Sequence, residues 1–250
     1  MCGLEIGGPT EILASDGPLP LYDVFGSLDN CVYSTQTIWT QDGHEGAAFH
    51  YHPQKRPGKQ FICEASHLTT GSDYDCVVAS HCLEHLANPL LALSEWRRVL
   101  RENGILLLIL PHKDGTFDWR RPVTPLSHMI GDYENDVGED DLTHLPEVLA
   151  LHDLRRDPGA GTMEAFRERC RANHKFRAMH HHVFDTLTAL EIVNYAGFTV
   201  VRADCLLPFH IFIMASRDSE MARKELPFDT SQVLARSPFP SDQVEAKRPA

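Results

Sequence analysis

The hydrophobic pattern of the chain is dominated by two runs of consecutive apolar residues, CVVA at 76–79 and ILLLIL at 105–110. A run that is apolar on both faces and bounded by polar residues is typical of a strand in a parallel sheet covered on both sides. A shorter run, CGLEI at 2–6, leads into paired glycines. The pattern therefore predicts three buried strands.

Residues 88–104, between the two long runs, predict a helix because their apolar residues recur at helical spacing. Asn88 is a suitable N-cap with Pro89 in the first turn, and we expect Gly104 to end the helix. Two buried strands joined by a helix form a βαβ unit, whose crossover is almost always right-handed.

Weaker patterns predict the remaining elements. Further strands are expected at residues 31–39, 60–66, 199–207 and 209–216, and further helices at 143–154, 162–176 and 184–198. The last two strands are close enough in the sequence to form a hairpin. This order predicts an α/β fold with a Rossmann-like, doubly wound and mostly parallel sheet that ends in an antiparallel hairpin.

The chain of 250 residues is long enough for one domain with an insertion. We expect a single α/β domain over residues 1–216. Within it, the charged and histidine-rich residues 113–182 would form a helical lid after the fifth strand. Residues 217–250 are charged and proline-rich with few apolar positions, so we expect a loosely ordered tail.

The formal net charge of −12 at pH 7 argues against a nucleic-acid partner or an anionic membrane surface, because both require clustered Lys and Arg. No apolar stretch approaches the ~20 residues that span a membrane. No basic-then-apolar leader follows Met1. The seven cysteines form no CxxC pair, which fits the reduced thiols of a cytoplasmic protein.

Glycine or polar residues follow each of the three buried strands, as Gly7-Gly8, Ser80-His81 and Pro111-His112. In a doubly wound sheet, ligands bind outside the carboxyl ends of the strands, where the strand order reverses. We therefore expect these residues to face a ligand-binding crevice.

The segment LEIGGPT at 4–10 resembles the first motif of class I S-adenosylmethionine-dependent methyltransferases, in which an acidic residue precedes a glycine-rich turn. A dinucleotide-binding turn would need G-x-G-x-x-G and fits less well. Residues 64–111, EASHL…YDCVVASHCLEHLANPLLALSEWRRVLRENGILLLILP, closely resemble the central half of the same domain. The resemblance implies a seven-stranded sheet with one antiparallel strand, S-adenosylmethionine as cofactor, and a small-molecule acceptor.

The resemblance assigns part of the cofactor to the tips of the buried strands. Gly7 and Gly8 would line its methionine and ribose part, and Glu5 would organise the turn or face the sulfonium. Ser80 and His81 would lie near the methionine moiety.

The adenine and the ribose hydroxyls complete the implied cofactor site. Glu64 and Ala65 would sit by the adenine, where the family uses a short acidic or polar side chain against the exocyclic amine. The family usually places an acidic residue on the ribose hydroxyls at the second strand. Asp29 is the candidate here and Asp23 the reserve, in a segment that departs from the family's pattern.

The chain holds fifteen histidines, many of them in residues 113–182. A neutral imidazole is suited to accept a proton from an acceptor group. His112, delivered at the end of a central strand, and His181 are the candidate catalytic residues. A divalent metal held by histidine and carboxylate groups is the alternative use of this set, whereas a single histidine is more often a surface or capping residue.

The sequence favours a methyltransferase that transfers the methyl group in line to a small molecule. A second subunit in a homodimer is an alternative to the insertion as cover for the substrate. Two other classes of protein stay open. One is a metal-dependent enzyme that uses the histidine-rich insertion, and the other is a non-catalytic binding protein that keeps the fold.

Overall fold

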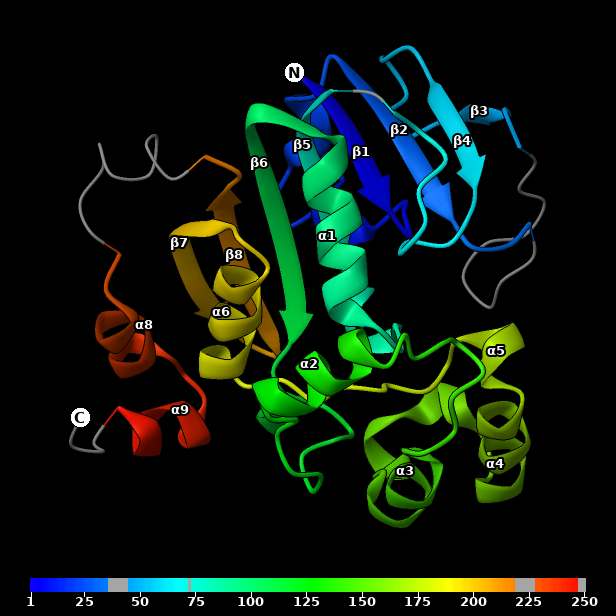
Figure 1. The fold of residues 1–250 in the computed structure, drawn as a ribbon, viewed down its shortest axis with the longest axis vertical. Coiled ribbons are helices and arrows are strands. Elements are labelled where there is room, and N and C mark those ends of the chain that lie inside the picture. Colours follow the sequence, from blue (N-terminus) through cyan, green and yellow to red (C-terminus); the bar gives the residue numbers. More distant parts are fainter. Residues whose placement is uncertain (36–44, 72, 219–227, 247–250) are drawn as a thin grey trace.

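The computed structural model describes residues 1–35, 45–71, 73–218 and 228–246. Their centre is one eight-stranded sheet in the order β3-β4-β2-β1-β5-β6-β8-β7 (Figure 1). The strands are β1 (Cys2–Ile6), β2 (Ser27–Val32), β3 (Ala48–Phe49), β4 (Gly58–Ile62), β5 (Tyr74–Ser80), β6 (Leu100–Pro111), β7 (Thr199–Leu206) and β8 (His210–Ser216).

The sheet contains the expected mostly parallel arrangement. β1, β2, β4, β5 and β6 pair in parallel, whereas β8 runs antiparallel between β6 and β7. The two-residue β3, which the sequence did not indicate, pairs antiparallel with β4 and makes the eighth strand. The Rossmann-like α/β class and the closing hairpin are confirmed. The strand order reverses between β1 and β5, and this is the place where such sheets bind ligands.

One face of the sheet is covered by helices (Figure 1). The described residues form α1 (Pro89–Val99), α2 (Leu126–Glu134), α3 (Leu145–Leu151), α4 (Met163–Arg171), α5 (Asn173–Phe176), α6 (Thr186–Tyr195), α8 (Thr230–Arg236) and α9 (Pro240–Glu245). Of these helices, α1, α2, α6 and α8 contribute side chains to the core on this face. Trp96 of α1 and Ile192 of α6 are fully buried in the same core as Val77 and Leu108 of the sheet. No helix among the described residues is long and apolar enough to cross a membrane.

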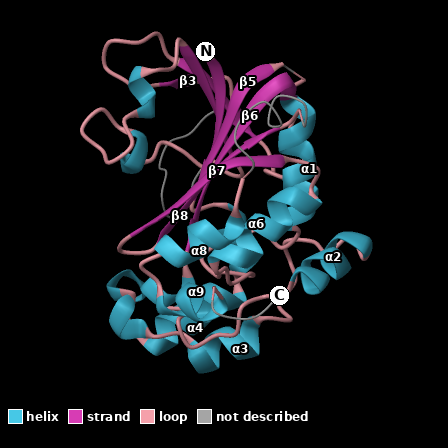
Figure 2. Cartoon of the chain, turned by 90° about the vertical axis from the view of Figure 1, so that its left-hand side faces the viewer, coloured by secondary structure: helices cyan, strands magenta, loops and turns pink. Residues whose placement is uncertain are grey.

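The opposite face is covered by loops and short 3-10 turns rather than by a long helix (Figure 2). Leu28 and Val78 of the sheet belong to a second core with Leu13, Tyr22 and Phe25 from the segment between β1 and β2. Because successive strand residues point to opposite faces, Val77 enters the first core and Val78 the second.

The insertion predicted after the fifth strand is helical. α2 to α5 lie beyond the carboxyl ends of the parallel strands (Figure 1), where Val148, Phe166 and Met179 belong to a small separate core. The returning chain is tied to the main domain because the N–H of His181 donates to the carbonyl of Glu84 at 2.8 Å. The insertion is thus fixed over the edge of the sheet that was expected to bind the ligand.

The expectation of a loosely ordered tail is wrong for residues 228–246. They form α8 and α9, whose region buries Val233 and Phe239. Asp242, 1% exposed, accepts a hydrogen bond from the Thr186 hydroxyl at 2.5 Å. Val233, Leu234 and Phe239 are buried, whereas Val244 is exposed. Three buried side chains are therefore enough to pack this segment, although its apolar content is low.

The helix of the predicted βαβ unit begins as expected, since the Asn88 side chain accepts a hydrogen bond from the N–H of Leu91 at 3.0 Å. It ends at Val99 and not at Gly104. Leu100 already pairs with Tyr74 of β5, so the strand begins earlier than its apolar run.

The strand expected at residues 31–39 is misplaced. β2 ends at Val32, and residues 36–39 lie outside the described part of the chain. The polar side chains of Asp29 and Asn30 concealed this strand, because each serves a specific hydrogen bond within the sheet.

Candidate functional site

A cavity of about 230 Å³ lies at the carboxyl ends of β1, β2, β4 and β5. Its walls are formed by residues at the end of each of these strands, by residues of the turn between β5 and α1, and by Arg177 of the insertion. Of the residues that the sequence assigned to the cofactor, the cavity is lined by Gly7, Glu64, Ala65, Ser80 and His81.

The glycine turn after β1 has a shape that side chains would disturb. Gly7 has φ of +82°, a conformation that L side chains rarely adopt. The Gly8 peptide is held by Asn30, whose side-chain oxygen accepts from the Gly8 N–H at 3.1 Å and whose amide donates to the Gly8 carbonyl at 2.9 Å. The sequence did not indicate Asn30, because the predicted strand began after it, at residue 31, whereas β2 spans Ser27–Val32.

Glu5 lies beneath the turn and does not line the cavity. Its carboxyl group is 1% exposed and accepts a hydrogen bond from the Tyr22 hydroxyl at 2.9 Å. A Cβ added at Gly8 would lie 2.1 Å from the Glu5 carboxyl carbon, so the glycine makes room for this carboxyl. Burial raises the pKa of Glu5 to about 8. The group supports the turn from below, which is the first of its two predicted roles.

The structure does not bring Asp29 or Asp23 to the cavity. The Asp29 carboxylate accepts hydrogen bonds from the Tyr74 hydroxyl and the Lys59 N–H, both at 2.8 Å. Asp23 pairs with His52 at 3.0 Å on the outside of the turn segment. Neither carboxylate is positioned to reach ribose hydroxyls in the cavity.

Ser80 and His81 stand at the tip of β5, as predicted. The Ser80 hydroxyl is buried and has no hydrogen-bond partner among the described residues, so a ligand in the cavity can provide one. His81 has φ of +50°, unusual for a residue other than glycine. Its Nε2 lies 3.0 Å from Nδ1 of His210 on β8.

Three cysteines also line the cavity: Cys31, Cys63 and Cys82. The sulfurs of Cys31 and Cys63, at the ends of neighbouring strands, are 3.4 Å apart. The hydrogen bond between the two sulfurs lowers the pKa of Cys63 to about 6. The sequence indicated only small hydrophobic roles for these residues, because their proximity arises from strand pairing.

The insertion closes one side of the cavity with Arg177. This side chain is only 7% exposed and donates a hydrogen bond to Glu64 at 2.6 Å. Its guanidinium carbon lies 4.9 Å from the centre of the Tyr33 ring, and Glu139 is a second ion-pair partner. Glu64 is therefore already paired with a residue that the sequence gave no reason to place there.

His112 does not line the cavity. It is fully buried, its ring stacks on Phe239 at a centroid distance of 3.9 Å, and its Nε2 lies 3.2 Å from Asp242. The N–H of Asp114 donates to its Nδ1 at 3.1 Å, so the proton resides on Nε2 and is donated to Asp242. The strand argument placed His112 at the correct edge, but α9 covers it.

His181 also lies outside the cavity lining and is buried in the insertion. The Asn173 amide donates to its Nε2 at 3.0 Å, and Asn173 is oriented by the N–H of Met179. Burial lowers the pKa of His181 to about 2, which keeps the ring neutral. This arrangement gives His181 a structural contact and no access to a ligand in the cavity.

The histidines of the insertion nevertheless gather with carboxylates. Three sets in the described residues have potential ligand atoms within 4.8 Å of one another. They are His128–His144–His182, Asp141–His144–His181 and Glu84–His85–His180. Only the last set includes a residue that lines the cavity, His85.

Residues 45–108 match the sequence model of a family described as a methyltransferase domain. The matched segment spans β3 to β6 and includes the βαβ unit and the cavity residues from Cys63 to Leu86. Over this segment, the chain therefore has the predicted resemblance to a methyltransferase domain. No curated protein sequence matches the chain.

Several solved structures are similar to the chain at low sequence identity. A Methanosarcina mazei S-adenosylmethionine-dependent methyltransferase is 14% identical, with 87% of this chain and 92% of that chain covered and a TM-score of 0.47. Burkholderia thailandensis 1,6-didemethyltoxoflavin-N1-methyltransferase, solved with S-adenosylhomocysteine, is 12% identical, with 87% and 71% covered and a TM-score of 0.47. A chain of the Haloferax volcanii complex between the Trm112 methyltransferase activator and a methyltransferase is 9% identical, with 87% and 82% covered and a TM-score of 0.47.

Proposed function

We propose that the protein is a methyltransferase that moves the methyl group of S-adenosylmethionine in line to a small-molecule acceptor. One observation carries this proposal: the cavity lies at the reversal of strand order and is lined by the ends of four parallel strands. The match of residues 45–108 to a methyltransferase domain supports the same cofactor.

The cofactor would lie along the strand tips in the order that the sequence implies. The open turn at Gly7 admits its methionine and ribose part, and the unpaired hydroxyl of Ser80 would bind the same end. The adenine would rest near Ala65, which lines the cavity beyond β4. Asn30 orients the turn from behind, and no acidic residue in the described part of the chain takes the ribose position at the end of β2.

A histidine that removes a proton from the acceptor must be in reach of an acceptor bound in the cavity. His81 lines the cavity, whereas His112 and His181 do not. We assign the general-base role to His81, since an imidazole within hydrogen-bond reach of an acceptor can take its proton as the methyl group moves. Its contact with His210 at 3.0 Å orients the ring.

Calorimetric titration with S-adenosylhomocysteine tests the cofactor site. The Gly7→Asn variant places a side chain in the cavity while keeping a residue that tolerates positive φ. We expect wild-type protein to bind and Gly7→Asn to lose roughly tenfold or more in affinity, equivalent to about 1.4 kcal/mol.

The Gly197→Asn variant is the matched control. Gly197 has φ of +83°, almost the same as Gly7, but it ends α6 and contacts Arg97 outside the cavity. It should bind like the wild type. Equal affinity in all three proteins, or no binding to folded wild type, would contradict the proposed site.

A further inference from the structure

Glu84 is a buried carboxylate without the contacts that normally stabilise one. The residue is 1% exposed, and neither carboxylate oxygen has a hydrogen-bond partner among the described residues. His81 Nδ1 is an ion-pair neighbour at 3.6 Å, beyond hydrogen-bond distance. A buried charge is costly unless it is paired, hydrogen-bonded or bound to a metal.

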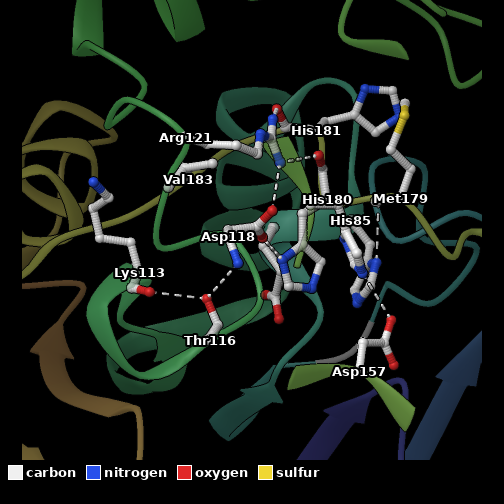
Figure 3. Close-up of polar contacts among 12 residues, drawn as sticks. His85, Lys113, Thr116, Asp118, Arg121, Asp157, Met179, His180, His181 and Val183 are labelled. Carbon is white, nitrogen blue, oxygen red and sulfur yellow. Dashed lines mark hydrogen bonds and ion pairs between the residues drawn. The ribbon is translucent and has the colours of Figure 1, made fainter. Parts of the chain in front are cut away.

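Two imidazoles from different parts of the chain lie near this carboxylate, and both of these residues, His85 and His180, are labelled in Figure 3. His85 follows Glu84 directly in the turn after β5, and His180 comes from the returning end of the insertion. One potential ligand atom from each of the three residues lies within 4.8 Å of the other two. Two ligands at ~2.1 Å from one ion are at most about 4.2 Å apart, so the three atoms, none more than 4.8 Å from another, need to move only slightly to share an ion.

Hydrogen bonds behind the two rings orient them toward Glu84. His180 Nδ1 lies 2.6 Å from Asp118 Oδ2, and Asp118 is in turn paired with Arg121 at 3.1 Å (Figure 3). His85 Nδ1 lies 3.3 Å from the carbonyl of Met179. An acceptor for the proton of one ring nitrogen is the usual arrangement behind metal-bound histidines.

We propose that Glu84, His85 and His180 bind a divalent first-row transition-metal cation such as Mn²⁺ or Zn²⁺. Two imidazoles and one carboxylate suit such an ion and leave coordination positions open. The buried oxygens of Glu84 would then gain the partner that they lack.

An acceptor bound in the cavity would reach the ion, because His85 forms part of the cavity wall. Resting on the proposed function, this position identifies the acceptor as a hydroxyl compound. Coordination lowers the pKa of a hydroxyl, and its proton would pass to His81. The oxygen then forms a bond to the methyl carbon as the carbon–sulfur bond of the cofactor breaks, which releases S-adenosylhomocysteine.

Of the two other sets, His128–His144–His182 is better satisfied without an ion. His128 Nε2 lies 3.1 Å from His144 Nε2, and His182 Nε2 lies 2.9 Å from Asp132. These nitrogens already have partners, and His128 is 41% exposed. This set provides the control for the experiment.

Metal binding can be measured on the full chain without an acceptor. Protein treated with a chelator and dialysed is titrated with MnCl₂ or ZnCl₂ by calorimetry, and its metal content is determined by mass spectrometry. We expect one high-affinity ion per chain. The near-isosteric Glu84→Gln and the variant His85→Asn should each weaken binding at least tenfold, whereas His128→Asn should leave it unchanged.

Each result decides the proposal. Folded wild-type protein that binds no ion would overturn it, and so would loss of the ion in His128→Asn with retention in Glu84→Gln. If Glu84→Gln fails to fold, His85→Asn gives the decision, and nitrogen coupling in the electron paramagnetic resonance of wild-type protein loaded with Mn²⁺ or Cu²⁺ reports imidazole ligation. Titration of metal-free protein with S-adenosylhomocysteine distinguishes failure of the metal site from failure of the proposed function. The cofactor can bind to protein that binds no ion, and an ion can bind to protein that binds no cofactor.

Discussion

Cys63, in the wall of the cavity, has a thiol whose reactivity can be measured directly. Its sulfur lies 3.4 Å from that of Cys31, and the hydrogen bond between them lowers the pKa of Cys63 to about 6 and raises that of Cys31. An unperturbed cysteine titrates near ~8.5. We predict that alkylation of Cys63 by iodoacetamide rises with a midpoint near pH 6 and is almost constant above pH 7, followed by peptide mass spectrometry.

The neighbouring thiol gives this prediction its control. Cys31→Ala removes the hydrogen bond between the two sulfurs, so the midpoint for Cys63 should move toward higher pH. S-adenosylhomocysteine should slow the alkylation, because Cys63 lines the cavity. A midpoint near ~8.5 in the wild type, or no change in Cys31→Ala, would show that the two sulfurs do not share a proton in this way.

Glu5 makes folding stability depend on pH. Its pKa is about 8 when folded because of burial and about 4.3 when unfolded. Between these values the folded chain retains a proton that the unfolded chain releases, so stability falls as pH rises from about 4.3 to 8, by at most about 1.4 kcal/mol per pH unit. Urea unfolding at pH 5.5 and pH 8 should show a smaller loss in Glu5→Gln than in the wild type, and equal losses would refute this role.

At the scale of single residues, the sequence predicted those whose position follows from a strand end. Gly7, Ser80 and His81 are at the cavity because the carboxyl ends of parallel strands share one edge. Asn30 and Arg177 could not be predicted, since their contacts with Gly8 and Glu64 join residues 22 and 113 positions apart. The position of His112 outside the cavity lining could not be predicted for the same reason, because its partner Asp242 lies 130 positions away.

Among the elements, α8 and α9 should contribute strongly to stability. Phe239 is 2% exposed and stacks on His112. Phe239→Ala should cost about 3–5 kcal/mol of the free energy of unfolding, as expected for a large buried aromatic side chain. Deleting residues 218–250 should lower the melting temperature further. Exposed Val244 in the same helix gives the control, since Val244→Ala removes little buried area and should be nearly neutral.

The contact between β6 and α9 predicts a separate outcome for His112. His112→Ala removes the stack on Phe239 and leaves the buried Asp242 without one partner. We expect a loss of about 1–3 kcal/mol in stability. S-adenosylhomocysteine affinity should stay near the wild-type value, because the ring is outside the cavity. A His112→Ala variant with unchanged stability that no longer binds the cofactor would contradict this prediction and show that His112 contributes to the cofactor site.

The element pattern was predictable where local signals were strong. The βαβ unit carried a cap, a proline in the first turn and helical spacing, and α1 formed where these signals placed it. The prediction misplaced β2 because Asp29 and Asn30 interrupt its apolar pattern. These two side chains form hydrogen bonds with Tyr74 and Gly8. The tail was misjudged because two short helices need only a few buried side chains to be fixed on an existing core.

For the whole molecule, the insertion and the sheet act together on one cavity. The sheet provides the turn at Gly7 and the tip at Ser80, and the insertion adds Arg177 as a wall and His180 beside Glu84. The fold class could be predicted because the order of strands and helices determines it. The enclosure of the cavity could not, since it depends on how residues 113–182 return to the turn after β5.

A crystal structure of the protein with S-adenosylhomocysteine tests the central claim most directly. The account predicts the methionine and ribose part of the ligand at the Gly7 turn, a hydrogen bond to the Ser80 hydroxyl, and the adenine beside Ala65. The sulfur should face His81 and the opening toward His85. Ligand bound elsewhere, or a cavity that stays empty in crystals grown at saturating ligand, would contradict it.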